Sequence, residues 1–132
     1  MSADGTSYLD SSALVKLIVN EAQTEALVAH LSRRSRSSCA LALVEVVRAV
    51  RGKGAEATAA ARRVMTGVEL LALDDTLLRD AADLGDAELR SLDAIHVAAA
   101  RTLGTDLAEL ITYDRRMAGA ARALGLPVLA PA

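Results

Sequence analysis

The stretch TSYLDSSALVKLIV, residues 6–19, joins a strand pattern to a helix pattern and decides the class of fold. Residues 6–9 have the composition of a short buried strand, and this run ends at Asp10. In residues 12–19 the apolar side chains have helical spacing. A strand that leads directly into a helix is typical of α/β proteins with a parallel sheet, so we expect this class.

The rest of the chain continues the alternation of strands and helices. We expect further strands at 37–40, 68–73, 110–113 and 127–131. We expect helices at 24–32, 41–52, 55–66, 75–84, 92–104 and 117–125. Asp74 or Asp75 can cap the helix that reaches Leu84, and Ser91 can cap the helix that ends at Gly104. The sequence therefore predicts an α/β domain with a mostly parallel sheet.

The length and composition fit a single domain over residues 1–132. Apolar residues make up 52% of the chain, which is ample for one buried core. Acids or arginines interrupt every apolar run, so we expect no membrane span. The first ten residues lack the features of a signal peptide, and the lone Cys39 has no partner for a disulfide or a Cys-rich zinc site. We therefore expect a cytoplasmic protein in which Cys39 fills the core.

The charge balance gives no strong indication of nucleic-acid binding. The chain has 15 basic and 17 acidic residues, without the positive excess of many nucleic-acid binders. Its two aromatic side chains, Tyr8 and Tyr113, are too few for base stacking to be the main way of holding RNA. Function must therefore be inferred from particular residues.

Four acids have apolar neighbours, whereas most of the others fall in turns, at helix caps or on polar helix faces. Asp10 ends the first strand, and Asp114 ends the strand LITY. Glu45 lies within LALVEVV, and Asp93 lies within LDAIHVAAA. An ionised carboxylate among apolar side chains is costly unless a cation pairs with it. An ordinary ion pair, such as Glu45 with Arg48, could explain one acid, but a shared cation explains all four better.

The expected positions of these acids favour a metal site. Asp10 and Asp114 should emerge at the same edge of a parallel sheet, and the first turn of the helix that holds Asp93 should lie near that edge. Carboxylates that converge there without a metal would repel one another. Oxygen ligands suit a hard cation, so we expect Mg²⁺, with Mn²⁺ as a substitute, rather than Zn²⁺. Water bound to such an ion could be activated to attack a phosphodiester.

Four segments carry a resemblance to a known family. YLDSSALVKL, ALALVEVVRAV, LRSLDAIHVAAA and ITYDRRMAGAARALGLPVL together resemble PIN-domain ribonucleases, specifically toxins of the VapC type. The resemblance covers nearly the whole chain, in the order and spacing of the family. It implies a three-layer α/β/α sandwich around a short parallel sheet, with an acidic pocket that binds Mg²⁺ or Mn²⁺ and hydrolyses RNA. It further implies a homodimer and a VapB-like antitoxin partner whose tail blocks the pocket, and the interrupted apolar runs noted above give no reason to expect a membrane partner.

On this resemblance the four acids take the roles of the family's acids. Asp10 and Asp93 match the principal metal ligands, and Glu45 completes the site directly or through water. Asp114 matches a fourth acid, which in the family more often holds water or a second metal. Ser12 matches a hydroxyl that orients a carboxylate, although it could also be a helix N-cap. Activated water, rather than a protein nucleophile, would attack the phosphorus.

Other polar residues carry weaker expectations. His96 follows Asp93 by one helical turn on an apolar helix, so we expect a packed histidine. Arg115 and Arg116 follow Asp114 and could contact phosphate. A further arginine cluster is expected to form a solvated face: Arg33, Arg34 and Arg36.

Several other classes of protein are alternatives to this reading. A receiver-type domain needs adjacent acids after its first strand and a lysine after a late strand, but the lysines here are Lys16 and Lys53. A haloacid-dehalogenase-type phosphatase needs an acid where this chain has Ser12. Two alternatives stay open. One is a PIN fold retained only for binding. The other is a nuclease directed at DNA, since no feature of the sequence indicates recognition of the 2′-hydroxyl of RNA.

Overall fold

The computed structural model describes residues 5–85 and 87–132, and its centre is a five-stranded sheet. The strands lie in the order β3-β2-β1-β4-β5, and their bounds are Thr6–Leu9 (β1), Ser35–Cys39 (β2), Glu69–Leu71 (β3), Leu107–Ile111 (β4) and Val128–Leu129 (β5). Each neighbouring pair of these strands is parallel. The predicted α/β class is confirmed, and the sheet of the described residues is parallel throughout rather than mostly parallel.

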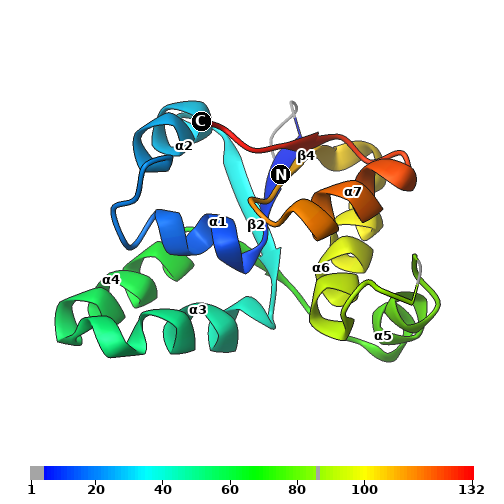
Figure 1. Ribbon diagram of the computed structural model, residues 1–132, viewed down its shortest axis with the longest axis horizontal. Coiled ribbons are helices and arrows are strands. Elements are labelled where there is room, and N and C mark those ends of the chain that lie inside the picture. Colours follow the sequence, from blue (N-terminus) through cyan, green and yellow to red (C-terminus); the bar gives the residue numbers. More distant parts are fainter. Residues whose placement is uncertain (1–4, 86) are drawn as a thin grey trace.

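Helices cover both faces of the sheet and give the expected three layers (Figure 1). They are α1 (Ser11–Lys16), α2 (Thr24–Leu31), α3 (Ala42–Val50), α4 (Ala55–Thr66), α5 (Asp75–Ala82), α6 (Ser91–Thr102) and α7 (Arg115–Ala123), with 3-10 turns at Arg51–Lys53 and Gly104–Asp106. Apolar residues of α1 to α4 pack with Leu9 and Ile111 on one face. Those of α5 to α7 pack with Tyr8 and Leu110 on the other face. Successive strand residues therefore enter opposite cores, as the pleat of a strand requires.

Most element boundaries differ from the prediction by one to three residues, and two of the differences have local reasons. The first helix ends at Lys16 instead of residue 19, because the amide of Leu17 turns back to a carbonyl only three residues earlier. β4 begins at Leu107, before the predicted start at residue 110. The earlier part of this strand includes the buried Glu109, whose polar side chain interrupts the apolar pattern.

The two helix caps that the sequence proposed have different outcomes. Asp74 caps α5 and accepts a hydrogen bond from the amide of Leu77 at 2.8 Å, so this prediction is confirmed. Ser91 is the first residue of α6, and Arg90 occupies the N-cap position, so the predicted serine cap is wrong. No helix within the described ranges has the length and apolar character needed to cross a membrane. Two acids expected at the surface lie outside those ranges: Asp4 and Asp86.

The carboxyl ends of β1 and β4 lie side by side, and the candidate site lies at this edge of the sheet. Leu9 pairs in register with Ile111, and the amide of Asp10 donates to the carbonyl of Ile111 at 3.2 Å. The residues that follow each strand, from Asp10 and from Thr112, therefore meet at one edge of the sheet.

Candidate metal centre and active site

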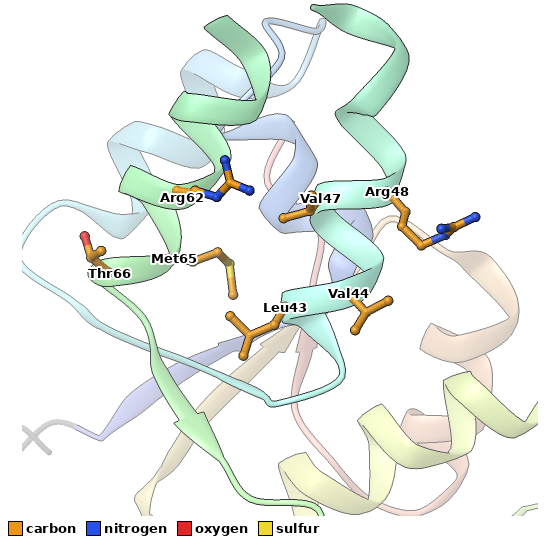
Figure 2. A pocket seen from close by; sticks show the side chains of 7 residues that line it. All are labelled: Leu43, Val44, Val47, Arg48, Arg62, Met65 and Thr66. Atoms are coloured by element: carbon orange, nitrogen blue, oxygen red, sulfur yellow. The ribbon is translucent and has the colours of Figure 1, made fainter. Parts of the chain in front are cut away.

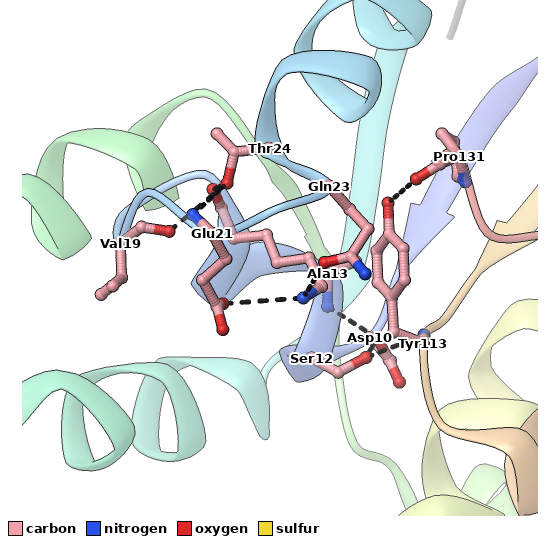
Figure 3. Close-up of polar contacts among 10 residues, drawn as sticks. Asp10, Ser12, Ala13, Val19, Glu21, Gln23, Thr24, Tyr113 and Pro131 are labelled. Carbon is pink, nitrogen blue, oxygen red and sulfur yellow. Dashed lines mark hydrogen bonds and ion pairs between the residues drawn. The ribbon is translucent and has the colours of Figure 1, made fainter.

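Asp10 lies at this edge and is buried, with 2% of its surface exposed. Its Oδ1 accepts hydrogen bonds from Ser12 Oγ at 2.6 Å and from Ala13 N at 3.0 Å (Figure 3). Its Oδ2 accepts a hydrogen bond from Thr112 Oγ1 at 2.5 Å. Burial raises the pKa of Asp10, and these hydrogen bonds offset part of that rise. The carboxylate is therefore held in one orientation at the start of α1, which it caps.

Two hydroxyl groups connect Asp10 to the segment after β4. Ser12 Oγ accepts the amide of Tyr113 at 3.1 Å, and Thr112 Oγ1 accepts the amide of Asp114 at 3.1 Å. Ser12 orients a carboxylate as expected, but it is not the helix cap, because Asp10 fills that position. Sequence reasoning missed Thr112, although a hydroxyl two residues before the strand-end acid was a readable signal.

Asp93 lies close enough to Asp114 and to Asp10 for its charge to interact with theirs. Asp93 is in the first turn of α6, and Asp114 caps α7 by accepting the amides of Arg116 at 2.9 Å and Met117 at 3.1 Å. The pKa of Asp93 is raised, first by burial, next by the negative charge of Asp114, and to a smaller extent by that of Asp10. The structure thus brings together three of the four acids singled out in the sequence.

Glu45, in the first turn of α3, has protein partners of its own. Its Oε1 accepts hydrogen bonds from His96 Nε2 at 2.6 Å and from Ser11 Oγ at 2.6 Å. Burial alone would raise the pKa of Glu45, but the hydrogen bonds from His96 and Ser11 lower it overall. Glu45 therefore has an ion-pair partner within the protein, and this partner is His96 rather than the Arg48 that helical spacing suggested.

His96 connects Glu45 to the hydrophobic core. It is 1% exposed, and its Nδ1 lies 2.8 Å from Tyr8 Oη and 3.8 Å from Cys39 Sγ. Burial lowers the pKa of His96, but its contacts with Cys39 and Glu45 raise it to about 10. A packed histidine was expected, as was a buried Cys39. The contact with Glu45 could not be read from spacing, because the two residues are 51 positions apart.

The oxygen atoms of these acids are the candidate ligands for a metal ion. Within residues 5–85 and 87–132, no three His, Cys, Asp or Glu side chains stand together as a ready-made metal site. Mg²⁺ commonly binds through one or two carboxylates and keeps several waters, so it does not need such a cage. The pKa values of Asp10 and Asp93 are raised, and a bound cation would stabilise the ionised form of both acids. This donor set therefore fits a hard divalent cation.

The arginines noted in the sequence lie in two different surroundings. Arg33 and Arg34 are exposed just before β2, at the amino end of the sheet, and Arg34 Nη1 lies 3.5 Å from Glu109 Oε2. The third member of that cluster, Arg36, is half-buried in β2. Arg115 and Arg116 are instead exposed at the start of α7, directly after Asp114. Of this second pair, Arg115 borders a hollow that Asp114 also lines, whereas Arg116 does not, so the structure does not support a phosphate contact for Arg116.

A separate groove of about 590 Å³ lies between α3 and α4 (Figure 2). Its lining is mostly apolar and includes Leu43 and Val44, which are 48% and 57% exposed. Arg48 and Arg62 flank it, and none of the described lining residues is an acid. The groove is therefore distinct from the carboxylate pocket.

Comparison with known sequences identifies the family. The PIN domain model matches residues 7–123. The chain is 50% identical over 125 residues to Ribonuclease VapC46 of Mycobacterium tuberculosis, and 41% identical over 129 residues to Ribonuclease VapC35 of the same organism. Each match covers 94% of this chain and 96% of the relative.

Solved structures with low sequence identity share the fold. VapC20 of Mycobacterium tuberculosis, described as a toxin that cleaves the sarcin–ricin loop, superimposes with a TM-score of 0.74 at 18% identity over 96% of this chain and 100% of that one. A toxin–antitoxin complex from Klebsiella pneumoniae gives 0.68 at 17% identity, over 96% and 98%. The family model, the relatives and the fold agree, and the chain belongs to the PIN domain family, among the VapC proteins.

Proposed function

We propose that this protein is a metal-dependent endoribonuclease that hydrolyses RNA phosphodiester bonds and serves as the toxin of a toxin–antitoxin pair. The observation that carries the proposal is the meeting of Asp10, Asp93 and Asp114 at one edge of the sheet. Relatives that are named ribonucleases support RNA as the substrate. A toxin that attacks cellular RNA acts in the cytoplasm, and we place this protein there.

In this proposal Asp10 and Asp93 hold Mg²⁺ or Mn²⁺, and Glu45 and Asp114 complete the pocket directly or through water. The ion would neutralise charge on the phosphate and activate water for the attack. Ser12 and Thr112 keep the Asp10 carboxylate in one orientation, so little reorganisation is needed when substrate enters. No side chain of the pocket needs to act as a nucleophile.

Cleavage of a labelled structured RNA tests the proposal, with Asp93→Asn and Asp75→Asn as a matched pair. Both acids lie in the first turn of a helix, but Asp75 is exposed on α5 and Asp93 faces the other acids. We expect cleavage by wild type with Mg²⁺ or Mn²⁺, none with EDTA, a loss of at least about a hundredfold in Asp93→Asn and in Asp10→Asn, and full activity in Asp75→Asn.

The same assay separates the remaining alternatives. A parallel reaction with single-stranded DNA of the same sequence would identify a DNA-directed enzyme if only the DNA is cut. If wild type cuts neither substrate but still binds an antitoxin, the domain is a binding module. Mg²⁺ should also raise the melting temperature of wild type more than that of Asp93→Asn, because a ligand that binds only the folded state stabilises it.

We further propose that a VapB-like antitoxin inhibits this protein and that the toxin is a homodimer. A structural neighbour is described as a toxin–antitoxin complex, which supports a protein partner. The groove between α3 and α4 is the surface we assign to the antitoxin, since Leu43 and Val44 leave apolar area exposed and Arg48 and Arg62 can pair with acids of a partner.

A further inference from the structure

A second hollow opens directly beside the acidic pocket. It has a volume of about 670 Å³, and Thr112 and Asp114 form one part of its lining. Three cations line the same hollow: Lys16, Arg115 and Arg122. Asp114 is the one acid among its described lining residues. The chain as a whole carries a formal net charge of -2, so this gathering of cations is local.

Two of these cations lie along one face of α7. Arg115 and Arg122 are two helical turns apart, and both are exposed. Ala118, with its small side chain, lies between them in the sequence and lines the same hollow. The two arginines can therefore contact different phosphates of one extended strand.

The third cation, Lys16, is held at the base of the hollow. Its Nζ lies 2.9 Å from Gln23 Oε1 and 4.7 Å from the centre of the Tyr113 ring. Glu21 Oε1, at 3.7 Å, neutralises part of its charge. The side chain is only 12% exposed, so the ammonium group is fixed in position before any ligand binds.

The wall opposite α7 is also anchored. Tyr113 Oη donates a hydrogen bond of 2.7 Å to the carbonyl of Pro131 (Figure 3), and Ala130 and Ala132 on either side of that proline line the hollow. The amide of Tyr113 in turn donates to Ser12 Oγ, which orients Asp10. One residue thus joins the cationic hollow to the candidate metal ligands.

We propose that this hollow holds the RNA strand on one side of the scissile bond, with Arg115 and Arg122 contacting its backbone phosphates. The inference rests on the proposed ribonuclease activity. A cluster of carboxylates repels a polyanion, so the substrate needs cations beside the cleavage point. Arginine binds phosphate in a bidentate manner, and the scarcity of aromatic side chains favours backbone contacts over base stacking.

The structure supplies a matched control on the same helix. Arg116 is exposed, as Arg115 is, but it does not line the hollow; it lines a neighbouring groove with Glu88 and Gly119, which Arg115 also borders. Arg116→Gln therefore removes one charge from α7 without touching the proposed path, whereas Arg122→Gln removes one charge from within it. Both changes lie on the surface of a helix, so neither should prevent folding.

The experiment measures binding of a fluorescent single-stranded oligoribonucleotide by anisotropy, in EDTA to prevent cleavage, across a range of salt concentrations. We expect Arg122→Gln to weaken binding about fivefold at 0.1 M salt and to reduce the salt slope by about 0.7, the value for one phosphate contact on a single strand. Arg116→Gln should stay within about twofold of wild type. With Mg²⁺, Arg122→Gln should raise KM and leave kcat unchanged.

Equal binding and equal salt slopes for the two variants would overturn the proposal. So would a loss of antitoxin binding in Arg122→Gln with RNA binding intact, because the hollow would then be a protein site. Failure of wild type to cleave any RNA would refute the proposed function instead. Wild-type cleavage with no difference between the variants would refute only the assignment of this hollow.

Discussion

Thr112 donates a hydrogen bond of 2.5 Å to Oδ2 of Asp10, although the two residues are 102 positions apart in the chain. They follow the neighbouring strands β1 and β4, whose carboxyl ends are in register. The same Thr112 oxygen accepts the amide of Asp114. One hydroxyl therefore fixes the orientation of a proposed metal ligand relative to the loop that carries another acid.

Thr112→Val should lower RNA cleavage by about tenfold to a hundredfold, because the Asp10 carboxylate loses a donor that orients it. The substitution keeps the shape of the side chain, but it leaves a buried carboxylate oxygen without its hydroxyl partner. We expect the free energy of unfolding to fall by about 1–3 kcal/mol, measured in urea. Thr66→Val, at an exposed hydroxyl that bonds only its own helix, is the control. Unchanged cleavage in a folded Thr112→Val protein would show that Asp10 needs no such support.

Asp93→Asn should make the metal-free protein more stable at neutral pH. The pKa of Asp93 is raised in the folded state, mainly by burial and by the charge of Asp114, so the folded protein binds more protons than the unfolded chain. Stability is then lost as the pH rises from the ordinary value of 3.8 through the raised pKa. The Asp93→Asn variant does not lose this stability. We expect its free energy of unfolding to exceed that of wild type by at most about 1 kcal/mol, because solvent screens the charge of a partly exposed carboxylate.

Urea unfolding of wild type and Asp93→Asn at pH 4 and pH 7, in EDTA, measures this difference. The gain should be larger at pH 7 than at pH 4, because the raised pKa leaves more of wild-type Asp93 protonated in the folded state at the lower pH. Asp75→Asn removes an exposed charge from the same helical position and should show no such trend. A gain that is equal at both pH values would contradict the charge repulsion on which the metal site depends.

The position of the candidate site could be predicted because the ends of strands can be recognised in the sequence. The alternation of strands and helices predicts a parallel sheet, and a parallel sheet brings the residues after its strands to one edge, as Asp10 and Asp114 show. Asp93 followed from its place in the first turn of a helix. These positions depend on local patterns and one general rule of topology.

Pairings between distant side chains were beyond such reasoning. Glu109 is buried, as Asp10 is, and more so than Glu45, Asp93 and Asp114, yet it was overlooked, and it does not join the site. It accepts a hydrogen bond of 2.8 Å from Ser7 Oγ and contacts His30 Nε2 at 2.5 Å, near the amino end of the sheet. An apolar neighbourhood marks an acid that needs a partner. Whether that partner is a metal or a histidine 79 residues away depends on the tertiary structure.

Leu43→Asp should weaken antitoxin binding by at least about tenfold, because it places a charge in the apolar groove between α3 and α4. Leu78→Asp is the matched control, since Leu43 and Leu78 are 48% and 40% exposed on different helices. Binding is measured by titrating each toxin variant with a VapB-like antitoxin. Equal affinity in the two variants would place the antitoxin elsewhere, and a change from dimer to monomer in Leu43→Asp alone would assign the groove to a second copy of the toxin.

His96→Asn should impair cleavage far more than His96→Gln, although both variants carry an amide. The glutamine amide nitrogen can reach the position of Nε2 and keep the donor to Glu45, whereas the shorter asparagine reaches only toward Tyr8. The histidine needs Nε2–H for this bond whether it is neutral or charged, so the comparison does not depend on its protonation. We expect a loss of about tenfold to a hundredfold for asparagine and a few-fold for glutamine.

Tyr8→Phe removes the partner of Nδ1 and should cost stability with little loss of cleavage. Affinity for Mn²⁺, measured by calorimetry, should follow the same order as cleavage. If both amides are equally active at equal stability, His96 is only a core residue, and Glu45 needs no support from it.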